Sequence, residues 1–165
     1  MPIKIQLRLH SGEEIELSRC EENEIIERIV QEFCPAFAGR ASPIWVRDAG
    51  GNCAYFDRPA VAALGVKIAS QPVAPDVVVY DRSKNRLFLI DSATSRGPID
   101  ATRRAELSRT FAGSTAHLVF VTAFADTAAM AHCLSEIAWE TEVWVAQNPS
   151  HMIHFNGGRI MEPNQ

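Results

Sequence analysis

The chain has 165 residues, of which 47% are hydrophobic, and a formal net charge of −4 at pH 7. This length and composition suit one ordinary domain with a full core, so we expect residues 1–165 to form a single domain. Every apolar run falls short of the roughly 18 residues needed to cross a membrane, and we expect no membrane association.

Charge and cysteine positions bound the function further. Residues 13–32 hold eight of the twenty acidic residues, whereas residues 96–109 hold four arginines against two acids. The net charge argues against nucleic acid as a ligand, but a phosphate responds to the local basic cluster. The four cysteines are scattered, with no pair at the spacing of a zinc or redox motif, which favours a cytoplasmic protein.

The N-terminal half of the chain predicts two hairpins and two helices. Period-two alternation indicates strands, whereas apolar residues at helical spacing indicate helices. The predicted elements are strands at 3–9 and 13–17, a helix at 21–33 that ends before Pro35, strands at 44–47 and 53–57, and a helix at 59–64 that ends at Gly65.

The centre of the chain gives the clearest pattern. Residues 77–80 and 87–90 are continuous apolar runs typical of buried strands, with a turn at 82–85 between them. Further elements follow: a helix at 100–112, a strand at 117–122, a helix at 127–137 capped by Asp126, and strands at 142–146 and 152–155. This alternation predicts an α/β domain with a central mixed β-sheet flanked by helices.

Two aspartates end the central strands. If the hairpin has a four-residue turn at 82–85, Asp76 lies directly opposite Asp91. Like charges placed there destabilise a sheet, so the pair calls for a compensating cation. Carboxylate oxygens suit Mg²⁺, which typically takes one or two protein carboxylates. We therefore expect Asp91→Asn to abolish divalent-ion binding and to leave the fold as stable or more stable.

The spacing of these aspartates has a plainer interpretation, in which Asp76 follows Pro75 in a turn and Asp91 ends a strand. Spacing alone leaves the two interpretations level. The surrounding residues decide between them, because Pro75-Asp-Val-Val-Val-Tyr80 and Leu87-Phe-Leu-Ile-Asp-Ser-Ala-Thr-Ser-Arg-Gly-Pro98 resemble the catalytic core of the BsuBI/PstI type II restriction endonucleases, within the PD-(D/E)xK nuclease class. The resemblance covers nearly the whole chain, through the runs at 23–24, 32–33, 48–50, 64–65, 118–124, 137–144 and 151–157.

The resemblance implies a restriction-endonuclease-like fold and a Mg²⁺-dependent enzyme that cuts double-stranded DNA, with Mn²⁺ as a substitute ion. Asp76 and Asp91 would hold the metal. Two departures stand out: relatives usually carry Glu at position 91, and the wider class carries Lys where this chain has Ala93. Relatives of this type also carry a basic run on the following helix, where this chain has Thr102-Arg103-Arg104.

Arg103 is the candidate to supply the missing positive charge. It precedes Leu107 by one turn, so it should lean toward the sheet, where it could hold phosphate or stabilise developing charge. The equally weighted alternative is that Arg103 and Arg104 form a solvated helix face. Glu24 is a further catalytic candidate, because the first helix of this class often aims an acid at the metal, although an exposed Glu24 is favoured. Arg96, Arg103, Arg104 and Arg109 are the candidate DNA-binding residues.

Two classes of function remain open. The first is an endonuclease, expected as a homodimer because palindromic cutting needs two sites related by a two-fold axis. A separate DNA-recognition domain or subunit is a further expected partner, since this chain begins almost at the catalytic region. The second is a catalytically weak or inactive nuclease-fold module for DNA binding or assembly, suggested by Asp91, Ala93 and the acidic net charge.

Overall fold

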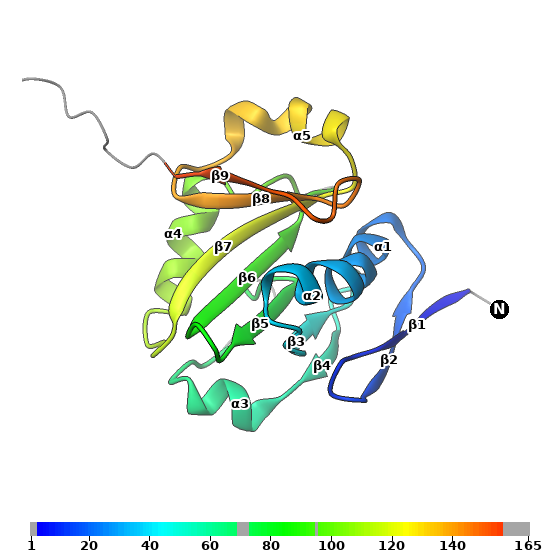
Figure 1. The fold of residues 1–165 in the computed structure, drawn as a ribbon, viewed down its shortest axis with the longest axis vertical. Helices are drawn as coiled ribbons and strands as arrows, with labels where there is room; N and C mark the ends of the chain where they lie inside the picture. Colours follow the sequence, from blue (N-terminus) through cyan, green and yellow to red (C-terminus); the bar gives the residue numbers. More distant parts are fainter. Residues whose placement is uncertain (1–2, 69–72, 95, 157–165) are drawn as a thin grey trace, which may run out of the picture.

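The computed structural model describes residues 3–68, 73–94 and 96–156. A seven-stranded mixed sheet forms its centre, in the order β4-β3-β5-β6-β7-β8-β9, beside a separate hairpin of β1 and β2 (Figure 1). The strands are β1 (Lys4–Arg8), β2 (Glu14–Ser18), β3 (Pro43–Arg47), β4 (Cys53–Phe56), β5 (Val77–Asp81), β6 (Arg86–Ser92), β7 (His117–Phe124), β8 (Thr141–Val145) and β9 (Met152–Phe155). The predicted α/β fold with a central mixed sheet and flanking helices is confirmed.

The helices cover both faces of the sheet (Figure 1). They are α1 (Glu21–Arg28), a π-helical segment (Ile29–Phe33), α2 (Cys34–Phe37), α3 (Arg58–Ala63), α4 (Ala101–Thr110), α5 (Thr127–Cys133) and a 3₁₀ turn (Leu134–Glu136). On one face the first helix packs Ile26 and Ile29 against Val79 and Ile90. On the other face, α3 and α4 pack residues such as Leu107 against Leu87 and Leu89 of β6. No helix in the described ranges is both long and apolar enough to cross a bilayer.

The central hairpin has the predicted register. Val77 pairs with Ile90 and Asp81 with Arg86, so the turn contains four residues. Strand β6 then pairs with β7 in parallel, and β7 with β8 in parallel, whereas the other neighbours are antiparallel. Because the side chains of β5 and β6 are buried on both faces, both strands are apolar throughout except at their ends. The two aspartates therefore lie side by side at the same end of two buried central strands.

The first helix does not end before Pro35 as predicted. The Cys34 amide donates to the Ile29 carbonyl, five residues back, which is a π-helical bond. Pro35 then occupies the first turn of α2, a position at which a missing amide hydrogen costs little. The change in hydrogen-bond spacing lets the chain continue as a helix past the proline. The predicted helix at 127–137 is also shorter, ending at Cys133 before the 3₁₀ turn.

Candidate active site

The candidate site is built where β5 begins and β6 ends. The backbone amide of Asp76 donates to Oδ1 of Asp91 at 3.3 Å, so the two residues adjoin as the hairpin register requires. Asp76 is fully buried and Asp91 is 5% exposed. Asp91 borders a cavity of about 230 Å³ whose walls are the end of β6, the segment after it and the start of α4. The sheet thus places Asp91 in the wall of this cavity and Asp76 directly behind it.

Asp76 is held on both carboxylate oxygens. The backbone amide and the hydroxyl of Ser92 each donate to Oδ2 at 2.8 Å. Arg96 donates to Oδ1 at 2.8 Å, and the guanidinium of Arg47 lies 3.1 Å from the same oxygen. Burial raises the pKa of Asp76, and the charge of Asp91 raises it further, although Ser92 and Arg96 oppose the change.

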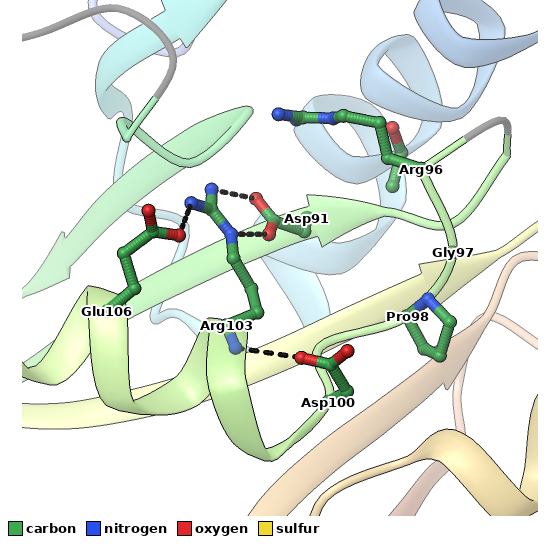
Figure 2. A pocket seen from close by; sticks show the side chains of 8 residues that line it. Asp91, Arg96, Gly97, Pro98, Asp100, Arg103 and Glu106 are labelled. Atoms are coloured by element: carbon green, nitrogen blue, oxygen red, sulfur yellow. Dashed lines mark hydrogen bonds and ion pairs between the residues drawn. The ribbon is translucent and has the colours of Figure 1, made fainter.

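Asp91 is held by Arg103. The Arg103 Nε donates to Oδ2 at 2.7 Å, and a terminal nitrogen donates to Oδ1 at 3.3 Å. The same guanidinium donates to the Val73 and Ala74 carbonyls and to Glu106. Figure 2 shows Arg103 reaching from α4 between Asp91 and Glu106. Burial lowers the pKa of Arg103, but Asp91 and Glu106 outweigh burial and leave that pKa raised, so the guanidinium stays charged.

Arginines accompany both aspartates, because Arg47 and Arg96 contact Asp76 and Arg103 contacts Asp91. A metal between the two aspartates stays a prediction. Among the described residues, no three His, Cys, Asp or Glu side chains converge closely enough to hold a metal by themselves. Any metal must share the two aspartates with water and substrate, which Mg²⁺ commonly does.

The basic residues fall into two groups. Arg103 leans toward the sheet, as its position one turn before Leu107 predicts, and the solvated alternative is wrong for this residue. Arg104 points elsewhere: it pairs with Glu140 at 3.2 Å and lies over the Phe120 ring. Arg109 is exposed in the last turn of α4, about two helical turns from Arg103. The site therefore includes Arg96 and Arg103, while Arg104 and Arg109 lie on other parts of the α4 surface.

The acid that α1 contributes is Glu22 in place of Glu24. Glu24 is exposed and pairs with Arg19 at 3.6 Å. Glu22 has a side chain that is 14% exposed, lies 3.7 Å from Arg47, and has a buried Oε1 with no hydrogen-bond partner among the described residues. Burial raises its pKa, and the charge of Asp76 raises it further. The sequence carries a signal for this outcome, since Glu22 precedes the buried Ile25 and Ile26 by three and four residues.

Asn23 fixes the start of α1 beside the site. Its side-chain amide donates to the Ser18 carbonyl and to Asp48, and its oxygen accepts from the Ala49 amide at 2.9 Å. These contacts join the helix to the β3–β4 turn. Arg47 ends β3 at that turn, and its amide donates to the Asp76 carbonyl at 2.8 Å. Two of the runs that carry the family resemblance, at 23–24 and 48–50, are thus joined in space.

Ala93 follows the site on β6, where the wider class carries lysine. Its amide donates to the Ala123 carbonyl at 2.9 Å, so it continues the pairing of β6 with β7. Its side chain is nearly buried and lines a surface hollow together with Glu22, Cys20 and Cys133. The positive charge that contacts Asp91 comes from Arg103, on α4.

The fold and the paired aspartates together define a restriction-endonuclease-like protein. The SdaI restriction endonuclease structure superimposes with a TM-score of 0.88 at 37% identity, over 97% of this chain and 50% of that chain. The family model for the BsuBI/PstI restriction endonuclease domain matches residues 5–158. The chain belongs to this family.

Two curated relatives agree. The chain is 46% identical to the type II restriction enzyme BsuBI of Bacillus subtilis over 160 residues, which cover 97% of this chain and 51% of that protein. It is 30% identical over 143 residues to the type II restriction enzyme AplI of Arthrospira platensis, covering 83% of this chain and 44% of that protein. The chain thus spans about half the length of these relatives.

Proposed function

We propose that residues 1–165 form the catalytic domain of a type II restriction endonuclease that hydrolyses phosphodiester bonds of double-stranded DNA. The observation that carries this proposal is the pairing of Asp76 and Asp91 beside a cavity that Arg96 and Arg103 line. Paired carboxylates can hold a divalent cation, and guanidinium groups can hold a phosphate. These are two of the components that phosphodiester hydrolysis needs.

The proposed cofactor is Mg²⁺, with Mn²⁺ as a substitute, and Asp76 and Asp91 would hold it. The donor set fits a hard cation, because both ligands are carboxylates. Burial raises the pKa of Asp76 and the charge of Asp91 raises it further, so a nearby cation would favour the ionised pair. The buried Oε1 of Glu22, without a hydrogen-bond partner among the described residues, is a third oxygen nearby. When bound, the ion supplies a more acidic water and stabilises negative charge on the phosphate.

The protein groups have separate roles in this proposal. Arg103 remains protonated and cannot act as a general base, so it orients a phosphate oxygen or stabilises charge that develops there. Arg96, Arg104 and Arg109 bind the DNA backbone. Glu22, in place of Glu24, is the acid of α1 that lies beside the pair, and it shares Arg47 with Asp76.

The proposal extends to assembly. A homodimer would place two such sites across a two-fold axis, as cutting both strands of a palindrome requires. The curated relatives are about twice as long as this chain, which leaves room in them for a DNA-recognition region, and we propose a recognition domain or subunit as a partner here. The four cysteines of the described chain are free thiols, which suits the cytoplasm, where DNA is cut.

A nuclease-fold module without turnover is the second candidate function. The observation in its favour is that arginines neutralise both aspartates, while Ala93 stands where the wider class has lysine. Such a module would bind DNA or a partner protein and would cut nothing.

A plasmid cleavage assay tests the proposal. With Mg²⁺ or Mn²⁺ present, the wild-type chain should cut, and Asp76→Asn and Asp91→Asn should each lose far more than the about 10–100-fold typical of groups that only support metal ligands. Arg8→Ala, on the exposed face of β1, should cut at the wild-type rate. Circular dichroism confirms that each variant is folded. Metal-dependent DNA binding without cleavage would favour the module, and undiminished cleavage by both aspartate variants would show that the site lies elsewhere.

A further inference from the structure

Charges in the site are nearly balanced without any metal. Four carboxylates (Glu22, Asp76, Asp91 and Glu106) face three guanidinium groups (Arg47, Arg96 and Arg103), which leaves a formal charge of −1. A divalent cation would raise the charge of this set from −1 to +1. At Asp76 Oδ1 the ion would also compete with two guanidinium groups, those of Arg47 and Arg96. Binding of the ion at this oxygen would therefore favour the departure of the arginine that is held least firmly.

Arg47 and Arg103 are poorly suited to leave. The Arg47 side chain is 9% exposed and lies against both Asp76 and Glu22. The Arg103 side chain is 14% exposed and donates to two backbone carbonyls and to Glu106 as well as to Asp91. Moving either group would strip a nearly buried charge of several partners, which is costly.

Arg96 differs from both. Its side chain is 39% exposed, and the hydrogen bond to Asp76 Oδ1 is its one contact with a carboxylate among the described residues. Figure 2 shows Arg96 extending from the segment before Gly97, separate from the cluster of Arg103, Asp91 and Glu106. Only the arginine side of this pair is partly exposed, since Asp76 is fully buried. The guanidinium can therefore return to water without being left buried and unpaired, while a bound cation would take its place at the buried carboxylate.

We propose that Arg96 is an exchangeable counter-ion that occupies Asp76 Oδ1 in the metal-free protein and is displaced when a divalent cation binds. Arg47 and Arg103 stay in place and hold the two carboxylates in position. The displaced Arg96 remains at the mouth of the cavity, where a DNA phosphate would approach. This inference rests on the proposed function, because it takes Asp76 as a metal ligand.

The exchange has a measurable consequence for metal affinity. Wild type must break the Arg96 pair before the ion binds, whereas Arg96→Gln has no such pair. Calorimetric titration with Mn²⁺, in the absence of DNA, should give about two- to tenfold tighter binding for Arg96→Gln. Arg96→Lys, which keeps a charge within reach of Asp76, should bind like wild type. Arg8→Ala removes the same charge from the far hairpin and should also leave the affinity unchanged.

Arginine labelling distinguishes displacement from a general charge effect. Phenylglyoxal modifies accessible guanidinium groups, and peptide mass spectrometry reads each site. Saturating Mn²⁺ should raise the labelling rate of Arg96 severalfold and leave that of Arg103 unchanged. Equal or weaker Mn²⁺ binding by Arg96→Gln, or Arg96 labelling that Mn²⁺ does not change, would overturn the inference. Neither measurement contains DNA, so a chain that binds Mn²⁺ in this way but never cuts a plasmid would contradict the proposed function alone.

Discussion

At the scale of single residues, the site is a network of ion pairs in which each carboxylate has a defined partner. The sequence names the two acids and two of the three arginines that contact them. It places Arg103 beside the acids, because Arg103 precedes Leu107 by one turn, but it gives Arg96 only as a DNA-binding residue. Arg47 gives no such signal: its contact with Asp76 depends on β3 lying beside β5, which the order of the elements does not determine. The sequence therefore gives the expected metal ligands without the arginines that share them.

The arginine pairs reverse the expected effect of Asp91→Asn on stability. The replacement would leave the nearly buried Arg103 facing a neutral amide, which can accept from only one of its two donors. We now expect a loss of about 1–3 kcal/mol in the free energy of unfolding without metal, the usual cost of a buried donor left unpaired. Urea denaturation at pH 7 measures it.

Glu106→Gln is the matched control for that measurement. Glu106 pairs with the same guanidinium at 2.9 Å, but its side chain is 40% exposed. Its loss should cost less than about 1 kcal/mol, as for other exposed pairs. If Asp91→Asn proved at least as stable as wild type, the carboxylate would be strained in spite of Arg103, as the sequence alone suggests.

At the scale of elements, periodicity predicts the positions of the apolar strands to within two residues at each end, but it fails where a helix changes type. The β5–β6 register follows from the turn length alone, whereas the π-helical segment before Pro35 depends on a hydrogen-bond spacing that no apolar pattern encodes. Likewise, the apolar stripe of α1 indicates which face is buried, yet Glu22 and Glu24 both lie near its start. Only Glu22 precedes Ile25 and Ile26 by three and four residues, and this spacing places it on the buried face of the helix.

Gly65, which belongs to the run 64–65 of the family resemblance, lies in close backbone contact with Gly113. Gly65 follows α3 with a φ of +77°, and Gly113 lies in the connection between α4 and β7. A Cβ on Gly113 would lie 2.5 Å from the Gly65 carbonyl oxygen, so two backbone segments would have to separate. Gly113→Ala should therefore reduce the free energy of unfolding by about 1–3 kcal/mol, as overpacking commonly does.

Gly50→Ala provides the comparison for Gly113→Ala. A Cβ at Gly50 would meet only the Asp48 carboxylate, at an ordinary 3.6 Å. Urea denaturation should show little change for this variant. Equal stability of the two alanine variants would mean that the α3 and α4 connections can move apart without cost.

At the scale of the whole molecule, segregated charge reconciles an acidic chain with the proposed DNA substrate. The acidic hairpin and first helix lie across the sheet from α4, so DNA that approaches the Asp91 cavity meets the arginines of α4 and of the segment before it (Figure 1). Many acids on the hairpin are also paired on its own surface, as Glu14 is with Arg8 and Glu16 with Lys4. The predicted basic cluster at 96–109 thus divides between the cavity and the outer surface of α4.

This division predicts unequal contributions of Arg104 and Arg109 to the salt dependence of DNA binding. Each phosphate that a protein neutralises contributes about 0.9 to the slope of log affinity against log salt concentration. Arg109 is exposed at the end of α4, so Arg109→Ala should reduce the slope by about that amount. Arg104 already pairs with Glu140 and covers Phe120, so Arg104→Ala should reduce it by less. Fluorescence anisotropy with a labelled duplex between about 50 and 200 mM salt, without divalent ions, gives the slopes.

Arg8→Ala, which removes the same charge from the hairpin, is the control and should keep the wild-type slope. If Arg109→Ala also kept the wild-type slope, Arg109 would not belong to the DNA-binding surface.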